Sequence, residues 1–377
     1  MNARAAVLAL LIVIVGPGLD AQSPPSLAEL QARARTDSND PVVHVALAQG
    51  FLRAKQVDSA CHALETAILI DREYAPAYLS LGRIESARFP PMISVLQVNG
   101  RLRFVRLPRV GTQDTTAVLF RRAFLLDPLQ ELYPVSSIGP VEWSMTLGHG
   151  LREYRRNKFD VAAAIFDTVI NQSDRRHKPP PPDALWYHAL SEVGAQRLDS
   201  AIPDMERLLD RALRDSTQFA DYESRSVRYS LAFLHQRAGH YQEAERLYRQ
   251  LLEEDMSLDL AHVQLATIYE IQQRWPEAVQ ERRGALLVAT GDPTLLYDLG
   301  VTLLEAGQVA EAADTLRRVV TLNPRESRAS YMLGIAAARL GAYQESRDAY
   351  NRFLLIAPSR YTEMIADAKE RLAHLPP

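Results

Sequence analysis

The sequence predicts an all-α solenoid of stacked helix pairs, because one pattern of residues returns every 34 positions between residues 225 and 360. A leucine followed by a small residue recurs at Leu231-Ala232, Leu265-Ala266, Leu299-Gly300 and Leu333-Gly334. Glycine keeps the same spacing at positions 239, 307 and 341, where Gln273 takes its place once. Two further columns hold Ala244, Ala278, Ala312 and Ser346, and then Tyr248, Leu316 and Tyr350, with Arg282 as the exception. Four independent columns at one spacing indicate a repeat architecture.

These columns resemble the tetratricopeptide repeat (TPR) family, whose unit is a helix–turn–helix of 34 residues. The phrases AGHYQEAERLY, AGQVAEAADTL and LGAYQESRDAY carry the resemblance, and Pro324 and Pro358 close the last two units. The small residues let neighbouring helices approach closely, and the glycine gives the turn its backbone freedom. The resemblance implies a right-handed superhelical solenoid of about eight units that binds other proteins in its concave groove.

Composition is that of an ordinary globular protein: 377 residues, 47% hydrophobic, with a net charge of −3. This near-neutral balance argues against nucleic acid as a partner, since nucleic-acid binders are usually basic. The single cysteine, Cys61, excludes an internal disulfide framework and is expected to be a buried packing residue.

The first 21 residues are predicted to be a secretory signal. A short start with one arginine precedes an unbroken apolar run at 5–15, and Gly16-Pro17-Gly18 breaks that run before Ala21. The alternative is a membrane anchor, but the run is shorter than the ~20 residues that span a bilayer. We therefore expect an exported protein, periplasmic or extracellular, without a stable transmembrane anchor after cleavage.

The repeat spacing divides the remaining chain into segments. A linker and capping helix occupy 22–40, and two units occupy 41–131. A connector at 132–142 leads to two irregular units at 143–224 with a proline-rich loop at 175–182. Four regular units follow at 225–360, and a capping helix at 361–377 presents Met364, Ile365, Ala368 and Leu372 on one side.

An insert at 89–113 interrupts the second unit. Two β-rich runs within 93–107 flank Asn99-Gly100, which is the strongest short signal for a β-hairpin because both turn positions need positive φ. Pairing across this turn puts Ile93, Val95 and Gln97 on one face with Leu102, Phe104 and Arg106.

No catalytic, metal or cofactor motif is found in the sequence. The nine histidines include no HExxH and no pairing with cysteine at metal-ligand spacing. His235 and His240 bracket a helix–turn boundary and are not expected to share a helical face. The prediction is therefore a protein that is not an enzyme and holds no cofactor or metal.

By resemblance to the family, side chains on the first helix of each unit line the concave groove. These candidate partner-binding residues are Tyr229, Phe233, Gln236, Arg237, Val263, Thr267, Glu270, Tyr297, Val301, Leu304, Tyr331, Ile335 and Arg339. Exposed tyrosine and arginine are typical of peptide-binding surfaces. The alternative is that some of them only pack between adjacent repeats. The lysines and asparagines with which some family members grip a C-terminal carboxylate are replaced by Tyr, Phe, Val and Thr, so an apolar or aromatic segment suits this groove better.

The insert supplies a second candidate site for an anionic partner, because Arg88, Arg101, Arg103, Arg106 and Arg109 occur with no acidic residue between positions 89 and 113. The alternative is that these arginines protect an exposed strand edge from pairing with other chains. Both explanations stay open.

The sequence thus predicts a non-catalytic scaffold for a protein or peptide partner. One rival is an enzyme, or an accessory in processing an envelope polymer, with a site in residues 88–182. Another is a carbohydrate-binding module that uses Tyr229, Tyr297 and Tyr331 as stacking platforms.

Overall fold

The computed structural model describes residues 25–88, 92–98, 101–107, 115–130, 143–214 and 224–376. The predicted signal at 1–21 and the connector at 132–142 lie outside these ranges. None of the helices within them is both long and apolar enough to cross a lipid bilayer.

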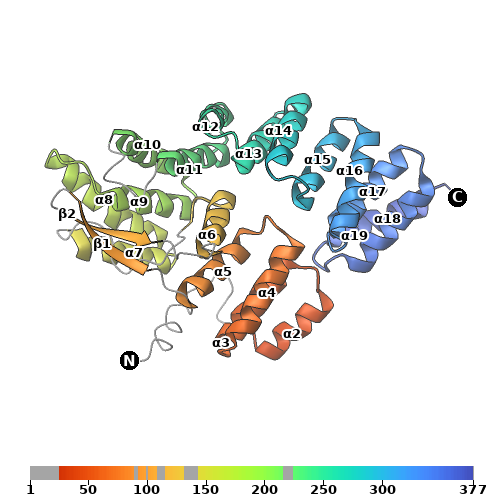
Figure 1. The fold of residues 1–377 in the computed structure, drawn as a ribbon, viewed down its shortest axis with the longest axis horizontal. Coiled ribbons are helices and arrows are strands. Elements are labelled where there is room, and N and C mark those ends of the chain that lie inside the picture. The colour runs from red at the N-terminus through yellow and green to blue at the C-terminus, as the bar shows by residue number, and fades with distance from the viewer. Residues whose placement is uncertain are drawn as a thin grey trace. The chain divides into compact units, whose positions relative to one another are not determined.

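The described residues form eight helix pairs flanked by a helix at each end, which confirms the all-α repeat fold (Figure 1). The pairs are α3 (Pro41–Arg53) with α4 (Val57–Ile70), α5 (Ala75–Arg88) with α6 (Thr115–Leu126), α7 (Ser144–Arg155) with α8 (Phe159–Arg175), α9 (Pro182–Gly194) with α10 (Leu198–Arg214), α11 (Ser224–Arg237) with α12 (Tyr241–Glu254), α13 (Asp259–Ile271) with α14 (Trp275–Val288), α15 (Pro293–Glu305) with α16 (Val309–Leu322), and α17 (Ser327–Arg339) with α18 (Tyr343–Ile356). The flanking helices are α2 (Leu27–Thr36) and α19 (Thr362–His374).

The turn inside a pair has the same backbone geometry wherever it is described. Its key residue adopts a positive φ, for example 83° at Gly239, 57° at Gln273 and 75° at Gly307. The amide of the following residue donates to the carbonyl five positions back, as His240 does to His235 at 2.8 Å. This is the Schellman motif, which satisfies the last carbonyls of the first helix. Glycine is favoured there because a side chain strains a left-handed backbone.

The repeated small residues lie where the helices of a pair approach most closely. Ala244, Ala278 and Ala312 are all 0% exposed. A methyl group added to Gly334 would lie 2.7 Å from the ring of Tyr350, a clash, so only glycine fits the closest approach of α17 to α18. The column pattern is therefore a packing pattern.

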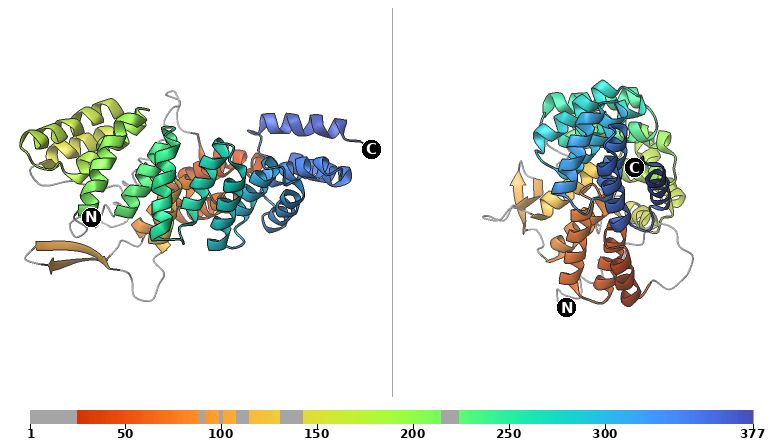
Figure 2. Two further views of the ribbon diagram at one scale, coloured as in Figure 1. Left: turned by 90° about the horizontal axis from the view of Figure 1, so that it is seen from above. Right: turned by 90° about the vertical axis from the view of Figure 1, so that its right-hand side faces the viewer.

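The insert in the second unit carries a two-stranded antiparallel ribbon, β1 (Met92–Val98) and β2 (Arg101–Leu107) (Figure 2). Its register pairs Val98 with Arg101 at one end, and Val95 with Phe104 in the middle. Residues on alternate positions therefore share a face, as in any paired strand.

The chain divides into two compact units. Unit 2 runs from Asp127 to Thr290 and stacks α7 to α14 in series. Unit 1 combines the residues up to Leu126 with those from Gly291 onward, so it contains the N-terminal helices α2 to α6 and the C-terminal helices α15 to α19. The predicted block of four regular repeats is thus shared between the two units.

Within unit 1, polar contacts join the two ends of the chain. Ser359 donates from its backbone N and its Oγ to the carboxylate of Asp37, at 2.8 and 2.9 Å. Asn39 donates to the carbonyl of Ile356 at 3.0 Å, and Arg360 pairs with the buried carboxylate of Asp40 at 2.7 Å. We refer to these contacts as the end-to-end clasp.

Helix α19 covers the last repeat, as the sequence predicts. Ala368 is 0% exposed, and Met364, Ile365 and Leu372 pack with it against Tyr350 and Phe353. A solenoid needs such a cap because its terminal repeat otherwise exposes an apolar face.

Candidate functional site

The thirteen predicted groove residues lie on four first helices, divided between the two units. Those on α11 and α13 belong to unit 2, and those on α15 and α17 belong to unit 1. We therefore describe each set within its own unit.

Three of the thirteen are core residues, which corrects their assignment as partner contacts. Tyr229 is 1% exposed, Val263 7% and Leu304 1%. Tyr229 lies edge-on to Tyr248, with 5.6 Å between ring centroids. A ring without exposed surface cannot serve as a stacking platform for a sugar, so Tyr229 does not play the part that a carbohydrate site requires.

On α11 and α13 the structure brings two glutamines together. Gln236 donates from Nε2 to Oε1 of Gln264 at 3.0 Å, and its own Oε1 accepts from the hydroxyl of Tyr248 at 3.1 Å. Gln236 and Gln264 are partly exposed, as is Phe233 one turn before Gln236 on α11, while Arg237 is exposed. We call Phe233, Gln236 and Gln264 the glutamine site. Gln264 is missing from the predicted set, because its contact depends on how α11 and α13 are stacked.

A buried ion pair lies next to this site on α13 and α14. Arg282 binds Glu270 in a bidentate manner, with Nε–Oε1 and Nη2–Oε2 distances of 3.0 Å each. The Arg282 side chain is 8% exposed and that of Glu270 is 24% exposed. The hydroxyl of Thr267 accepts from Arg282 at 3.5 Å and donates to the carbonyl of Val263 at 3.0 Å. The predicted contacts Thr267 and Glu270 are therefore held in fixed positions by Arg282.

The same two positions, twelve residues apart, recur in neighbouring repeats with different chemistry. These two positions hold Gln236 and Tyr248 in the repeat of α11 and α12. They hold Glu270 and Arg282 in the next repeat, and Leu304 and Leu316 in the one after it. Both leucines are buried, at 1% and 0% exposed. In the sequence, Arg282 is the exception in a column that otherwise holds Tyr or Leu. It identifies the repeat in which the surface formed by the first helices, the first-helix face, carries an ion pair.

In unit 1 the predicted tyrosines are occupied by contacts within the chain. Tyr297 lies below the guanidinium of Arg328, 4.9 Å from the ring centroid, and burial raises its pKa well above the ordinary value. The hydroxyl of Tyr331 donates to Asp367 of α19 at 2.6 Å. Burial, followed by this hydrogen bond, raises the pKa of Tyr331 to about 12.

The other predicted residues of unit 1 are also held within the chain to different degrees. Ile335 packs in the cluster under α19, and Arg339 donates to the carbonyl of Leu304 at 3.2 Å while staying exposed. Val301 is partly exposed. Helix α19 therefore covers part of the surface that the sequence predicts to bind a partner.

Of the predicted arginine patch, only the first residue, Arg88, has a described side chain. Arg88 pairs with Asp58 and with Glu85, acids that lie outside the insert, and its part in the patch stays a prediction. Arg101, Arg103 and Arg106 lie along β2, where the backbone is described. Arg109 lies outside the described residues.

The histidines differ from the sequence prediction in one respect. The rings of His235 and His240 do meet, with 3.4 Å between their Nδ1 atoms, because the Schellman turn folds residue 240 back over the end of α11. Burial and the neighbouring His240 lower the pKa of His235. Within the described ranges no group of three or more His, Cys, Asp or Glu side chains is arranged to hold a metal ion.

The fold and the repeated columns define a helix-pair repeat protein, and comparison with known proteins identifies its family. A profile of the tetratricopeptide repeat family matches residues 147–216, 229–292 and 297–361, more than half of the chain. The chain therefore belongs to this family. No curated protein sequence matches it.

Solved structures that resemble the chain include three repeat proteins. The C-terminal part of a TPR repeat-containing protein from Cytophaga hutchinsonii is 16% identical, with a TM-score of 0.49 over 60% of this chain and 86% of that one. MamA from Desulfovibrio magneticus RS-1 is 14% identical, with a TM-score of 0.39 over 50% and 96%. YrrB, described as a TPR protein with an unusual peptide-binding site, is 16% identical, with a TM-score of 0.40 over 54% and 97%.

Proposed function

We propose that the chain is a non-catalytic scaffold that binds a protein or peptide segment on the first-helix face of α11 and α13. The observation that carries this proposal is the glutamine site: two carboxamides held together at 3.0 Å, both partly exposed, beside a partly exposed phenylalanine. Polar groups that are already oriented lose little conformational entropy when a ligand binds.

The chemistry of this site suits an extended peptide. A carboxamide has two donor hydrogens and one acceptor oxygen, so it can satisfy both the N–H and the C=O of a peptide backbone. Gln236 and Gln264 bond to each other and Gln236 also accepts from Tyr248, yet the two carboxamides keep further donor and acceptor capacity. Phe233 offers an apolar contact, so we infer that the bound segment places an apolar or aromatic side chain there.

The location of the protein is part of the same proposal. The apolar run and small residues within positions 1–21 support export to the periplasm or the extracellular space. Expression of the full chain in a bacterial host, followed by mass spectrometry of the secreted or periplasmic fraction, tests this. A mature N-terminus after Ala21 would support export, and an intact Met1 in the cytosolic fraction alone would contradict it.

The binding proposal is tested with peptides selected by phage display against the immobilised full chain. The dissociation constant of a fluorescein-labelled selected peptide is measured by polarisation for the native chain and for Gln264→Ala. We expect the substitution to weaken binding by about tenfold, equivalent to about 1.4 kcal/mol for lost hydrogen bonds. Gln242→Ala is the matched control, because Gln242 is exposed on the second helix α12 of the same unit.

Two results would count against the proposal. One is a selected peptide whose affinity is unchanged by Gln264→Ala. The other is an equal loss in Gln242→Ala, which would mean that the peptide binds elsewhere on unit 2.

A further inference from the structure

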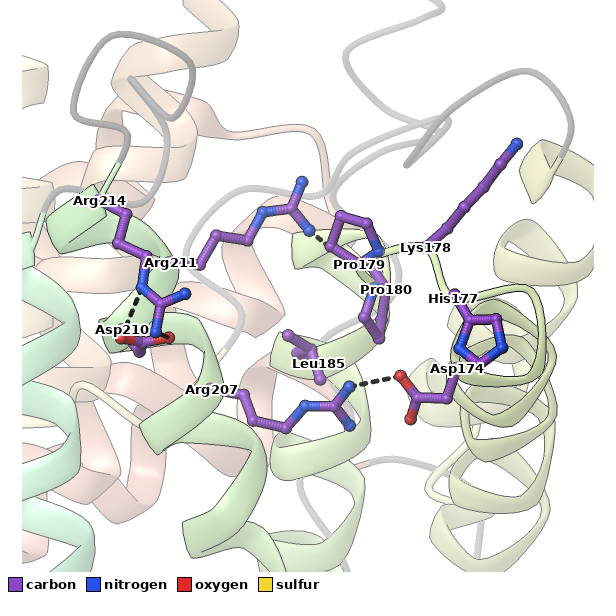
Figure 3. A pocket seen from close by; sticks show the side chains of 10 residues that line it. All are labelled: Asp174, His177, Lys178, Pro179, Pro180, Leu185, Arg207, Asp210, Arg211 and Arg214. Atoms are coloured by element: carbon purple, nitrogen blue, oxygen red, sulfur yellow. Dashed lines mark hydrogen bonds and ion pairs between the residues drawn. The ribbon is translucent and has the colours of Figure 1, made fainter.

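A separate depression lies in unit 2, away from the glutamine site, between the end of α8, the loop that follows it, and α10 (Figure 3). Its volume is about 550 Å³. Its lining residues are Asp174, His177, Lys178, Pro179, Pro180, Leu185, Arg207, Asp210, Arg211 and Arg214. Apart from Leu185 of the first helix α9, these come from the second helices α8 and α10 and from the loop between two repeats, so the depression is distinct from the glutamine site on α11 and α13.

Charge distinguishes this depression from the rest of a chain whose net charge is −3. Four cationic side chains and two carboxylates line it, an excess of two positive charges before histidine is counted. The three arginines occupy positions 207, 211 and 214 of α10, a spacing that places them on one side of a helix. Figure 3 shows Arg211 reaching from α10 toward the prolines of the loop and Arg207 reaching toward Asp174 of α8, with Leu185 between the two arginines.

The arginines are held in position by contacts within the chain, and those of Arg207 and Arg214 leave part of the guanidinium exposed. Arg207 pairs with Asp174 at 2.7 Å and Arg214 with Asp210 at 2.8 Å, while Arg211 donates to the carbonyl of Pro180. A guanidinium has five N–H donors, so one or two bonds do not exhaust it. The side chains of Arg207 and Arg214 are 40% and 78% exposed, and solvent can reach both.

The loop that closes the depression is rigid for reasons visible in the sequence. Four consecutive prolines, at positions 179–182, restrict its backbone. His177 has a positive φ of 53°, and Lys178 donates to the carbonyl of Ser173 at 3.0 Å, which ends α8 in a fixed turn. A smaller cavity of about 100 Å³, lined in part by Pro181 and Pro182, shares Lys178, Pro179 and Arg211 with the depression. The backbone that carries Lys178 and that accepts the hydrogen bond of Arg211 is thus fixed before any ligand arrives, which favours binding.

We propose that this depression binds the dianionic phosphoryl group of a small phosphate or phosphate monoester. An exposed pairing between two single charges contributes only about 0–1 kcal/mol, so a monoanion would gain little here. A dianion contacts several guanidinium groups at once and matches the excess of two positive charges. Arginine forks fit phosphate oxygens in a bidentate manner, and Lys178 on the rim can turn toward the ligand because exposed side chains change rotamer readily.

The test uses inorganic phosphate and phenyl phosphate as probes of the full chain, with binding measured by isothermal titration calorimetry. The site variant is Arg207→Gln with Arg211→Gln. The control variant is Arg175→Gln with Arg246→Gln, which removes the same charge from unit 2 at exposed residues that do not line the depression. Circular dichroism confirms that each variant is folded, and Lys178→Gln replaces the site variant if that variant is not.

We expect saturable binding that weakens by at least about tenfold in the site variant and by less than about twofold in the control. Binding of phenyl phosphate should also weaken below its second pKa, about 6, because the monoanion forms there. Equal affinities for the two probes would show recognition of phosphate itself, and tighter binding of phenyl phosphate would show recognition of a monoester; either supports the proposal. No saturable binding up to about 10 mM, equal losses in both variants, or acetate binding as tightly as phosphate would overturn it.

Discussion

The buried ion pair between Glu270 and Arg282 permits a quantitative prediction about the first-helix face. The following repeat fills the same two positions with Leu304 and Leu316, both fully packed. Glu270→Leu with Arg282→Leu therefore copies an arrangement that the solenoid already accommodates. Replacing a buried ion pair by packed apolar residues is often neutral or stabilising, whereas removing one partner is costly.

The exposed fractions give the expected sizes. Glu270→Leu leaves a guanidinium that is 8% exposed without its carboxylate, so we expect a loss of about 3 kcal/mol in the free energy of unfolding. Arg282→Leu leaves a carboxylate that is 24% exposed and partly hydrated, so the loss should be smaller, about 1–2 kcal/mol. The double variant should lie within about 1 kcal/mol of the native chain, whereas the single losses sum to about 4–5 kcal/mol, which makes the coupling energy about 3–6 kcal/mol.

Guanidinium chloride unfolding followed by circular dichroism measures the three differences, and hydrogen exchange at the amides of α13 and α14 localises them. Local exchange is needed because neighbouring repeats can unfold separately. Additive losses, with the double variant about 4–5 kcal/mol less stable than the native chain, would refute the reasoning that the two residues act as one packed pair.

Three further outcomes follow from single contacts. Gln273→Gly should raise the unfolding free energy by about 0.5–1 kcal/mol in a thermal melt, because Gln273 adopts a φ of 57° that glycine accepts without strain. Burial lowers the pKa of His188, but the hydrogen bond and charge of Asp204 outweigh burial and raise the pKa above 6.5. His188→Asn should therefore lower the free energy of unfolding at pH 6, and this loss should shrink as the pH rises through the raised pKa. Arg360→Gln should speed hydrogen exchange in α3 as well as around residue 360, because Arg360 pairs with Asp40 in the end-to-end clasp. Unchanged exchange in α3 would mean that the clasp does not stabilise the N-terminal helices.

The sequence predicted those features of the fold that repeat at fixed spacing. Gly334 and Ala312 recur because a helix pair cannot close around a larger side chain there, so their positions in the sequence located the helices. Gln273 was correctly aligned with the glycines although it is not one, and it adopts their positive φ. Each of these features is set within a single repeat or between neighbours.

Contacts between distant parts of the chain could not be predicted in this way. The clasp joins Asp37 to Ser359, 322 residues apart, and no periodicity reports on such a pair. The contact of Gln236 with Gln264 spans 28 residues and depends on how α11 stacks on α13. One local contact was also missed. His235 and His240 approach each other across a turn, and helical spacing predicts which side chains share a face only within a helix.

The predicted partner-binding residues fall into buried and partly exposed groups, depending on the side chains that pack against them. Tyr229 and Val263 belong to a column that faces the adjoining helix, and burial of such positions follows from close packing. Gln236, Thr267 and Glu270 lie where polar partners on the second helix or the next repeat hold them at partial exposure. In the column of Gln236, Glu270 and Leu304, the residue twelve positions later is Tyr248, Arg282 or Leu316, and its identity is the sequence signal that separates a polar side chain held by a partner from a buried leucine.

The central claim is that α11 and α13 carry the partner-binding face, and hydrogen–deuterium exchange of the full chain with and without a selected peptide tests it most directly. The account predicts slower exchange in the peptide complex at Ser224–Arg237 and Asp259–Ile271, with α12 unchanged on its outer side. Protection confined to β1 and β2, or to second helices alone, would contradict it.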